Sequence, residues 1–497
     1  MHPSKHARSQ PEKIAYRMAA SGETVTYAQL EKRSNQGAHL LRSLGLLRGD
    51  GIALMLENNA RFFEIVWAAQ RAGLYYTCLS TRLSDSDIAF ILQDSNSRIL
   101  ISSRAPDMQA IPDGITLFAP GGRDFVAERA KFPETPIEDE SPGNDMLYSS
   151  GTTGRPKGIR PPLPTGSLDQ SNALTDFGVN HYGMTADTTF LSPAPLYHAA
   201  PLRWCMSVNK LGGTVIVMEK FDAEEALALI DRFAITHGQF VPTHFLRMLK
   251  LPEDVRSRYD VSSLEVAFHA AAPCPVEVKR AMLNWFGPVL HEFYAGTEAN
   301  GLTAIGPEEW LERPGSVGRA VWGELRICDD EDQQLPPGEV GSIYFANGPE
   351  FIYHNDPDKT AASRNSHGWT TLGDVGRVDE DGYLFLADRQ AHVIISGGVN
   401  IYPQEIEDRL ITHPAIADIA VIGVADAEMG ERVVAVVQLA EDVTAGPDLA
   451  ENLRAHTRKE LGSIKTPSEF VFRDHLPREP TGKLVKRRLV EEFERGA

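Results

Sequence analysis

Runs of apolar residues alternate with amphipathic segments through the first three quarters of the chain, and this alternation limits the fold more than any other feature. Residues 214–218, TVIVM, are typical of a buried strand, and a helix is predicted from about Asp222 to Phe233. A strand near Gly238–Val241 and a helix that begins at Pro242 repeat the pattern. Strands that alternate with helices in this way favour parallel βαβ layers. We therefore expect an α/β fold.

The pattern changes after about Ser316, where short strands with turn signals predict a small β-barrel-like part. These strands are expected at Glu324–Cys328, Gly341–Phe345 and Gly382–Leu386. Helices return among the strands after Asp388. We expect a large N-terminal domain of layered βαβ subdomains, residues 1–388, and a small α+β C-terminal domain, residues 389–497.

The net charge of the 497-residue chain is −19, which disfavours nucleic acid or an anionic membrane as a partner. The first residues are polar, so no signal peptide is expected, and no run of about 18 or more apolar residues predicts a transmembrane segment. The four cysteines are far apart, which argues against a disulfide framework or a zinc site: Cys78, Cys205, Cys274 and Cys328. We expect a cytoplasmic protein.

The segment from Tyr148 to Gly158, YSSGTTGRPKG, is typical of a loop that binds a polyphosphate. Its glycines let the backbone approach a ligand, and successive N–H groups in such a loop can hold an anion. Hydroxyl donors and one lysine add to these groups: Ser149, Ser150, Thr152, Thr153 and Lys157. The glycine spacing differs from that of a Walker loop, and no Ser or Thr follows the lysine. A flexible surface loop is the alternative.

Two acidic motifs fit the same ligand. Residues 294–298, YAGTE, follow a predicted strand, where ligands of α/β sheets bind; Thr297 could donate to a phosphate and Glu298 could hold Mg²⁺. Asp374 follows a glycine, and an aspartate so placed can accept both hydroxyls of a ribose. A plain turn is the alternative interpretation of each motif.

Three further segments carry polar groups or glycines on turns. Gly397-Gly398 is a second glycine turn, and Lys483 lies on a turn, PTGK, from which it could reach another domain's site. A lone histidine such as His198 is more often structural than catalytic, and no pair of histidines has a convincing metal-ligand spacing.

Taken together, these segments resemble the adenylate-forming family of acyl-CoA synthetases, which includes beetle luciferases and peptide-synthetase adenylation domains. The motifs occur in the family's order over about residues 148–483, and the N-terminal segment also looks like the family's opening. They are YSSGTTGRPKG, PLYHAAP, YAGTE, WTTLGD, YLFLADR, ISGGVNIYPQEIE and PTGK. The resemblance implies that a carboxylate attacks the α-phosphate of ATP to give acyl-AMP and pyrophosphate. The thiol of CoA then attacks acyl-AMP to give a thioester and AMP.

The resemblance also implies the roles of the ATP-site residues. The loop would hold the β- and γ-phosphates through Ser149, Ser150, Gly151, Thr152, Thr153, Gly154 and Lys157. Thr297 would contact the α-phosphate, and Glu298 would coordinate Mg²⁺. The nucleoside would be held by Tyr294, Asp374, Arg389 and the backbone at Ala270, Ala271 and Ala272. Lys483 would bridge the attacking carboxylate and the α-phosphate in the first half-reaction only.

The acyl and CoA sites follow from the same resemblance. The acyl pocket would be apolar, with His198 as its gate or support, and would be lined by Ala200, Trp204, Phe240, Ala270, Gly296, Ala299 and Leu302. Arg203 is the one cation there that could pair with a second carboxylate, so a dicarboxylic acid is disfavoured. The C-terminal domain would rotate after adenylation, withdraw Lys483 and bring Gly397-Gly398 in to form the pantetheine channel.

The sequence departs from the family's pattern in three places. The hinge position, usually Asp or Lys, is Ala391, and the next residue, usually Asp, is His392. A histidine that often follows the phosphate loop is missing from residues 159–162, IRPP, which should form an extended turn. Alanine offers no polar side-chain group to either orientation of the C-terminal domain, so we expect the balance between the adenylating and the thioester-forming orientation to be shifted.

We expect an AMP-forming acyl-CoA synthetase whose substrates are ATP, CoA and a small hydrophobic carboxylic acid, with a fatty acid favoured. An aryl or phenylpropenoic acid is the first alternative, and transfer of the acyl group to a carrier protein is the second. A nucleotide-binding regulatory protein without turnover is the third. A homodimer stays open.

Overall fold

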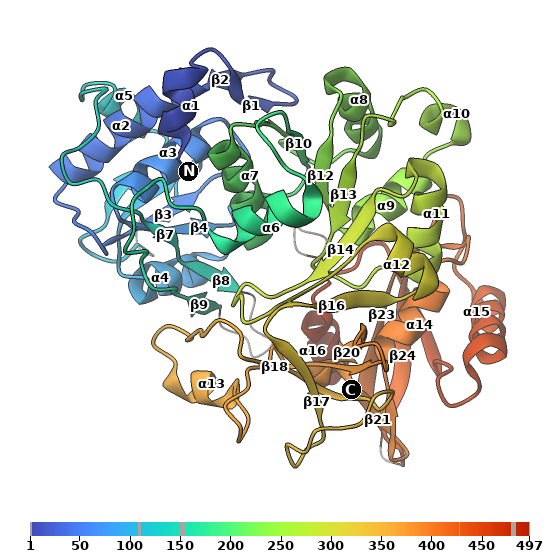
Figure 1. Cartoon of the computed structure of the whole chain (residues 1–497). Coiled ribbons are helices and arrows are strands. Elements are labelled where there is room, and N and C mark those ends of the chain that lie inside the picture. Colours follow the sequence, from blue (N-terminus) through green and yellow to red (C-terminus); the bar gives the residue numbers. More distant parts are fainter. Residues whose placement is uncertain (1, 108–110, 150–155, 427, 479–483, 497) are drawn as a thin grey trace. The chain divides into compact units, whose positions relative to one another are not determined.

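The computed structural model describes residues 2–107, 111–149, 156–426, 428–478 and 484–496 (Figure 1). The chain forms two compact units, and each unit is made of three segments that are not contiguous in sequence. Unit 1 contains Met1–Phe240, Leu251–Phe268 and Glu350–Ala361, and unit 2 contains Val241–Lys250, His269–Pro349 and Ala362–Ala497.

A parallel five-stranded sheet forms the first layer of unit 1, in the order β6-β5-β3-β4-β7. Its strands are β3 (Gly51–Met55), β4 (Tyr75–Leu79), β5 (Ser97–Ser102), β6 (Thr116–Phe118) and β7 (Asn144–Asp145). Every residue of β3 and β4 is buried, as is usual for parallel strands with both faces covered. The connecting helices are α3 (Arg61–Arg71) and α4 (Asp85–Asp94), and α2 (Tyr27–Ser43) packs against α3.

A second, longer sheet contributes five strands to unit 1 in the order β12-β10-β11-β1-β2, and among these only β2 (Thr24–Thr26) is antiparallel to its neighbour. Its other strands are β1 (Ile14–Met18), β10 (Thr189–Ser192), β11 (Thr214–Val217) and β12 (His237–Phe240). Its helices include α6 (Ala173–Tyr182), α7 (Ala199–Leu211) and α8 (Ala223–Phe233). The Asp222 carboxylate accepts a hydrogen bond from the N–H of Glu225 at 2.9 Å and so caps the N-terminus of α8. The strand and the helix predicted in this region are both confirmed, as β11 and α8.

Unit 2 contains a run of antiparallel strands in the order β17-β18-β19-β20-β16-β15-β14. The strands are β14 (Leu290–Tyr294), β15 (Leu302–Ile305), β16 (Ser316–Trp322), β17 (Glu324–Cys328), β18 (Gly341–Ala346), β19 (Asp374–Val378) and β20 (Leu384–Arg389). One side chain from each of four strands enters a shared core, made of Val317, Ile327, Ile343 and Leu384. This core lies in the part that the sequence predicts to be barrel-like. Helices α9 (Pro242–Leu249) and α11 (Val276–Phe286) pack on each other in the same unit.

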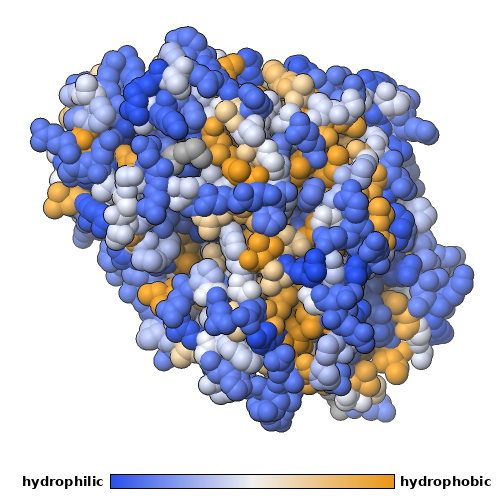
Figure 2. All heavy atoms as spheres, viewed as in Figure 1, coloured by the Kyte–Doolittle hydropathy of each residue, from blue (hydrophilic) through white to orange (hydrophobic). Residues whose placement is uncertain are grey.

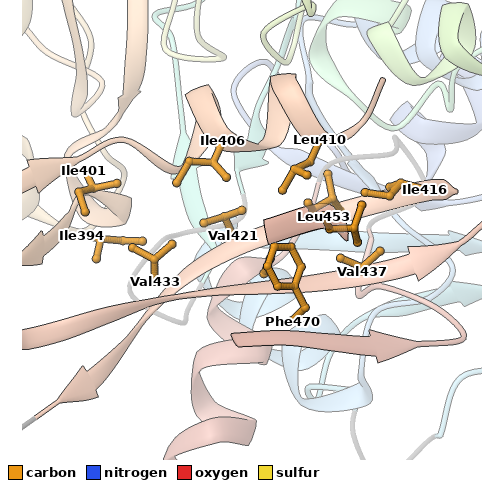
Figure 3. Packing of buried hydrophobic residues seen from close by; sticks show 12 residues of the cluster. Ile394, Ile401, Ile406, Leu410, Ile416, Val421, Val433, Val437, Leu453 and Phe470 are labelled. Atoms are coloured by element: carbon orange, nitrogen blue, oxygen red, sulfur yellow. The ribbon is translucent and has the colours of Figure 1, made fainter. Parts of the chain in front are cut away.

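The last part of unit 2 is a separate sheet in the order β22-β21-β24-β23, with β25 (Glu469–Arg473) paired to β24. The two long strands are β23 (Ile416–Asp426) and β24 (Gly430–Leu439). Figure 3 shows their apolar side chains meeting those of α14 (Pro403–Leu410) and α15 (Pro447–Leu461), with Ile406, Leu410, Val421, Val433 and Leu453 at the centre. This α+β arrangement confirms the fold class, a large α/β part followed by a smaller α+β part.

Hydrophobic side chains on the face seen in Figure 2 lie in small groups among hydrophilic ones. The most exposed large apolar side chains of the described residues are Leu47 and Ile464, which come from different units. No helix within the described ranges is long and apolar enough to cross a membrane.

Candidate nucleotide-binding and catalytic site

The segment predicted to bind phosphates is held by a β-hairpin in unit 1. Strands β8 (Leu147–Ser149) and β9 (Lys157–Ile159) pair antiparallel, with Ser149 opposite Lys157. The Lys157 ammonium lies 5.3 Å from the centroid of the Tyr353 ring, a cation–π contact. The pairing brings the two ends of the loop together. Five predicted phosphate-binding residues fall outside the described residues: Ser150, Gly151, Thr152, Thr153 and Gly154.

Three predicted nucleoside-binding side chains meet in unit 2. The Tyr294 hydroxyl donates to Asp374 Oδ2 at 2.7 Å, and Arg389 Nε lies 3.2 Å from Asp374 Oδ1. Asp374 and Arg389 face each other because they are paired residues of β19 and β20. Burial and the nearby Asp374 carboxylate raise the pKa of Tyr294, so the phenol keeps its proton and remains a donor.

This arrangement suits a carboxylate that accepts hydroxyl groups. Asp374 is buried, and the cationic Arg389 lies beside it as an ion-pair partner. Each carboxylate oxygen can accept about two hydrogen bonds, so one bond from Tyr294 leaves acceptor capacity for a diol. Asp374 and Arg389, which the sequence assigns to the ribose, therefore lie side by side, while ribose binding itself stays a prediction.

The turn that follows β14 carries a strained residue. Ala299 has a φ of 54°, and Ala271, in the segment predicted to contact adenine, has a φ of 75°. Non-glycine residues rarely adopt such angles, which cost about 1–3 kcal/mol each and are found at functional sites as well as at turns and helix ends. Both alanines lie in segments that the sequence assigns to the ligand site, so strain and prediction coincide.

The Glu298 carboxylate lies against the backbone of Gly296. A Cβ added to Gly296 would come within 2.7 Å of Glu298 Oε2 and 2.8 Å of Leu372 Cδ1, so a larger residue would displace the carboxylate or the leucine. No cluster of three or more His, Cys, Asp or Glu able to hold a metal occurs among the residues that the structure describes. One carboxylate fits Mg²⁺, which usually takes one or two carboxylates and completes its shell with phosphate oxygens and water.

A buried ion pair fixes the strand that carries Tyr294. Lys279 Nζ on α11 lies 2.6 Å from Glu292 Oε2 on β14, and the buried His269 Nε2 lies 3.5 Å from the same oxygen. Burial, and then the positive charge of Lys279, lower the pKa of His269, so this imidazole is neutral. Neither Lys279 nor Glu292 is predicted as a site residue from the sequence, although a glutamate inside the apolar segment LHEFY is an available signal.

One predicted acyl-pocket residue of unit 1, Trp204, belongs to an aromatic cluster. Trp204 on α7 is 1% exposed, with its ring centroid 4.7 Å from that of Phe268 and 5.7 Å from that of Tyr182. Ala200 lies on the same helix, and Phe240 ends β12 and is buried. Trp204 is thus a core residue as well as a predicted pocket residue. Two predicted residues of unit 2, Ala270 and Leu302, are also buried, while Gly296 and Ala299 are half-buried.

Arg203, the cation considered for a second carboxylate, is already paired. Its Nε and Nη2 each lie 2.8 Å from an oxygen of Asp145, which gives a bidentate ion pair within unit 1. The Asp145 side chain is 5% exposed. A second substrate carboxylate would therefore have to displace a buried partner.

His198 precedes the first residue of α7, and its ring centroid lies 4.2 Å from that of Tyr197. The predicted CoA turn, Gly397-Gly398, joins β21 (Ile394–Ser396) to β22 (Val399–Ile401) with φ values of 57° and 77°. Glycine is favoured there because left-handed backbone is strained for other residues. The position of Thr297 after β14 is as predicted, and Lys483 lies outside the described residues.

The predicted hinge forms a short 3₁₀ helix, Gln390–His392, which contains Ala391. His392 Nδ1 lies 3.5 Å from Asp388 Oδ1, and Asp388 Oδ2 accepts from the main-chain N–H of Gln404 at 3.0 Å. Asp388 therefore links the hinge to the first turn of α14. The predicted domain boundary between residues 388 and 389 falls inside β20 and remains a prediction.

The chain matches the model of the AMP-binding enzyme family over residues 4–350 and that of the AMP-binding enzyme C-terminal domain over residues 405–483. It is 31% identical to fatty acid–[acyl-carrier-protein] ligase ScoC of Streptomyces coeruleorubidus, over 99% of this chain and 95% of ScoC. It is 33% identical to feruloyl-CoA synthase of Amycolatopsis sp, over 99% and 98% of the two chains. The solved structure of ATP-bound MatB from Rhodopseudomonas palustris superposes with a TM-score of 0.83 at 28% identity, over 99% of each chain.

The first of these models alone covers more than half of the chain. The chain therefore belongs to the family of AMP-binding enzymes, as an adenylate-forming acid–thiol ligase.

Proposed function

We propose that this ligase joins a hydrophobic monocarboxylic acid to CoA through an acyl-adenylate, with ATP converted to AMP and pyrophosphate. The observation that carries the proposal is the Tyr294–Asp374–Arg389 arrangement, a buried carboxylate with spare acceptor capacity, oriented by a phenol and a guanidinium. These side chains would hold the ribose hydroxyls.

The phosphate roles rest on the hairpin and on the turn after β14. Ser149, Lys157 and the loop between them would bind the β- and γ-phosphates, and Thr297 would donate to the α-phosphate. Donors fixed before the reaction stabilise the charge that develops at phosphorus, because no reorganisation is needed at that moment. Glu298 would hold Mg²⁺, which neutralises phosphate charge when it is bound.

Lys483 would act in adenylation alone. Its ammonium would bridge the attacking carboxylate and the α-phosphate, and it would leave when the C-terminal domain, residues 389–497, rotates. Gly397 and Gly398 would then line the path of the pantetheine arm. The hinge at Ala391 is supported as a separate element by the short 3₁₀ helix that contains it.

A fatty acid is the proposed acyl substrate. The name of ScoC supports it, and the Arg203–Asp145 pair supports a monocarboxylic acid because it occupies the available cation. The acyl pocket would be lined by Ala200, Trp204, Phe240, Ala270, Gly296, Ala299 and Leu302. An aryl acid is the alternative substrate, supported by the similarity to feruloyl-CoA synthase and by the aromatic side chains around Trp204.

Transfer to a carrier protein is the second candidate, because the name of ScoC specifies an acyl carrier protein as acceptor. Both acceptors present a pantetheine thiol, so the proposed glycine turn serves either one. The cytoplasmic location and the homodimer stay predictions.

Pyrophosphate release tests the proposal. The protein is given ATP, Mg²⁺ and either a fatty acid series or a hydroxycinnamic acid series, with and without CoA. We expect release with fatty acids and thioester formation only when CoA is present. Acyl-AMP that CoA does not consume would favour the carrier protein, and no pyrophosphate with any acid would contradict the enzyme proposal.

A further inference from the structure

One carboxylate in unit 1 connects three segments that are distant in sequence. Asp94, the last residue of α4, accepts from the Tyr148 hydroxyl at 2.6 Å through Oδ2 and from Asn355 Nδ2 at 3.1 Å through Oδ1. Its main-chain carbonyl accepts from His354 Nε2 at 3.0 Å. That carbonyl lies at a helix end, where intrahelical partners run out. Together these four residues form a hairpin anchor: Asp94, Tyr148, His354 and Asn355.

The ring of Tyr148 fixes both strands of the phosphate-binding hairpin. Tyr148 pairs with Gly158 across the hairpin, and a Cβ on Gly158 would lie 2.9 Å from Tyr148 Cζ. The ring therefore lies directly on the glycine. Burial and the Asp94 hydrogen bond raise the pKa of the Tyr148 phenol, so it stays a donor at physiological pH.

The segment that supplies Asn355 also packs against β9. The His354 N–H donates to the Gly158 carbonyl at 2.8 Å, and Ile159, Phe351 and Tyr353 form a small buried cluster. Tyr353 is the ring beneath the Lys157 ammonium. Both strands of the hairpin are thus held by contacts that α4 and residues 351–355 supply.

We propose that Asp94 is a positioning residue for the β- and γ-phosphates of ATP, acting through Tyr148 and Asn355 on the hairpin that carries Ser149 and Lys157. The inference rests on the proposed function, which assigns the hairpin to these phosphates. Asp94 touches no substrate in this scheme. It fixes the hairpin before ATP arrives, so that less ordering opposes binding.

AMP separates this role from a purely structural one. Compared with ATP, AMP keeps the adenine, the ribose and the α-phosphate, but it lacks the β- and γ-phosphates that are assigned to the hairpin. A loosened hairpin should therefore weaken ATP binding and leave AMP binding unchanged. General loss of structure would weaken both.

The test measures the Kd of ATP with Mg²⁺ and the Kd of AMP by titration calorimetry, and the Tm of each variant. Tyr148→Phe removes one hydroxyl and keeps the ring on Gly158. We expect the Kd of ATP to rise about tenfold, as for a lost hydrogen bond to a charged group, and the Kd of AMP to change less than about twofold. Asp94→Ala should have the larger effect, and Asp94→Asn, which keeps an acceptor, the smaller one.

Asp85→Asn is the matched control, because it changes a carboxylate on the same helix whose ion-pair partner is Arg104 rather than the hairpin. It should bind both nucleotides like the wild type. Unchanged ATP binding in Tyr148→Phe and Asp94→Ala would overturn the inference, and so would equal losses for ATP and AMP. A wild type that binds ATP but forms no acyl-AMP would contradict the proposed function and leave the anchor supported by its binding data. A wild type that binds neither nucleotide would contradict both.

Discussion

Arg389 and Asp374 lie opposite each other on neighbouring antiparallel strands, with Arg389 Nε 3.2 Å from Asp374 Oδ1. The pairing of β19 and β20 creates this contact, so it forms with the sheet. Both partners are side chains that the proposed mechanism assigns to the ribose.

Asp374→Ala should lower kcat/KM for ATP by about 10- to 100-fold, because hydrogen bonds to a charged group contribute about 1.5–3 kcal/mol. Steady-state pyrophosphate release at varied ATP checks this. Tyr294→Phe should cause a smaller loss, since the carboxylate and Arg389 remain. Equal activity of Asp374→Ala and the wild type would remove the ribose assignment.

Lys483→Ala should reduce adenylation by about 100- to 1000-fold, the usual effect of losing one preorganised donor in a transition state. Thioester formation from supplied acyl-AMP and CoA should persist at the wild-type rate. The two half-reactions are measured separately in single-turnover experiments. A matched fall in both would show that the lysine does not act in adenylation alone.

Gly397→Ala should impair the opposite half-reaction. The φ of 57° is strained for alanine, and its Cβ would approach Met429 Cε to 2.6 Å. We expect thioester formation to fall about fivefold, as for a strain of roughly 1 kcal/mol, with adenylation unchanged. Gly446→Ala is the control, because a Cβ there meets no atom within 4 Å. Loss of adenylation in Gly397→Ala would contradict the assignment of this turn to CoA.

The acid preference should exclude dicarboxylic acids. Asp145 occupies Arg203, so the second carboxylate of octanedioic acid would be buried without a partner or would strand Asp145. We expect kcat/KM for octanoic acid to exceed that for octanedioic acid by more than about 100-fold. Comparable values would place the second carboxylate elsewhere.

Asp408 should make stability depend on pH. Burial raises its pKa to about 7, the Gln404 amide partly offsets this, and the nearby Glu407 and Asp388 carboxylates raise it further. The folded state therefore binds a proton that the unfolded state releases near pH 4, and stability falls as pH rises from about 4 to 7. Asp408→Asn should remove this dependence and raise stability at pH 8 by roughly 2 kcal/mol, less than the full shift because the side chain is half-buried. Urea unfolding at pH 5 and pH 8 measures the free energy of unfolding of the wild type and of Asp408→Asn. The same change with pH in both proteins would show that the pH dependence comes from other groups.

Most of the fold follows from local patterns. The strand at 214–218 and the helix from Asp222 were predictable because apolar runs and capping residues act over a few neighbours. The start of α14 at Pro403 follows in the same way, because proline suits the first turn of a helix. The pairing of Asp374 with Arg389 required the family resemblance, because nothing local in either segment specifies the other.

The contacts that hold the site could not be predicted in this way. Asp94 is 54 residues from Tyr148 and 261 residues from Asn355, and Arg203 is 58 residues from Asp145. Each is an ordinary charged residue in its own segment. Their partners are set by which strands and helices become neighbours, and this information resides in the packing of the whole unit.

Unit 1 includes a segment that comes late in the sequence, and this has a consequence for protein synthesis. Residues 350–361 complete unit 1, and Asn355 among them binds Asp94. Domains usually fold as units while the ribosome still makes the chain. Unit 1 is not complete until residue 361 has been made, so the first 268 residues wait for this segment with the phosphate-binding hairpin held to α4 through Tyr148 but without the contacts of residues 351–355. Any chain that stops between residues 268 and 350 should therefore be a target for chaperones or proteases rather than a stable fragment.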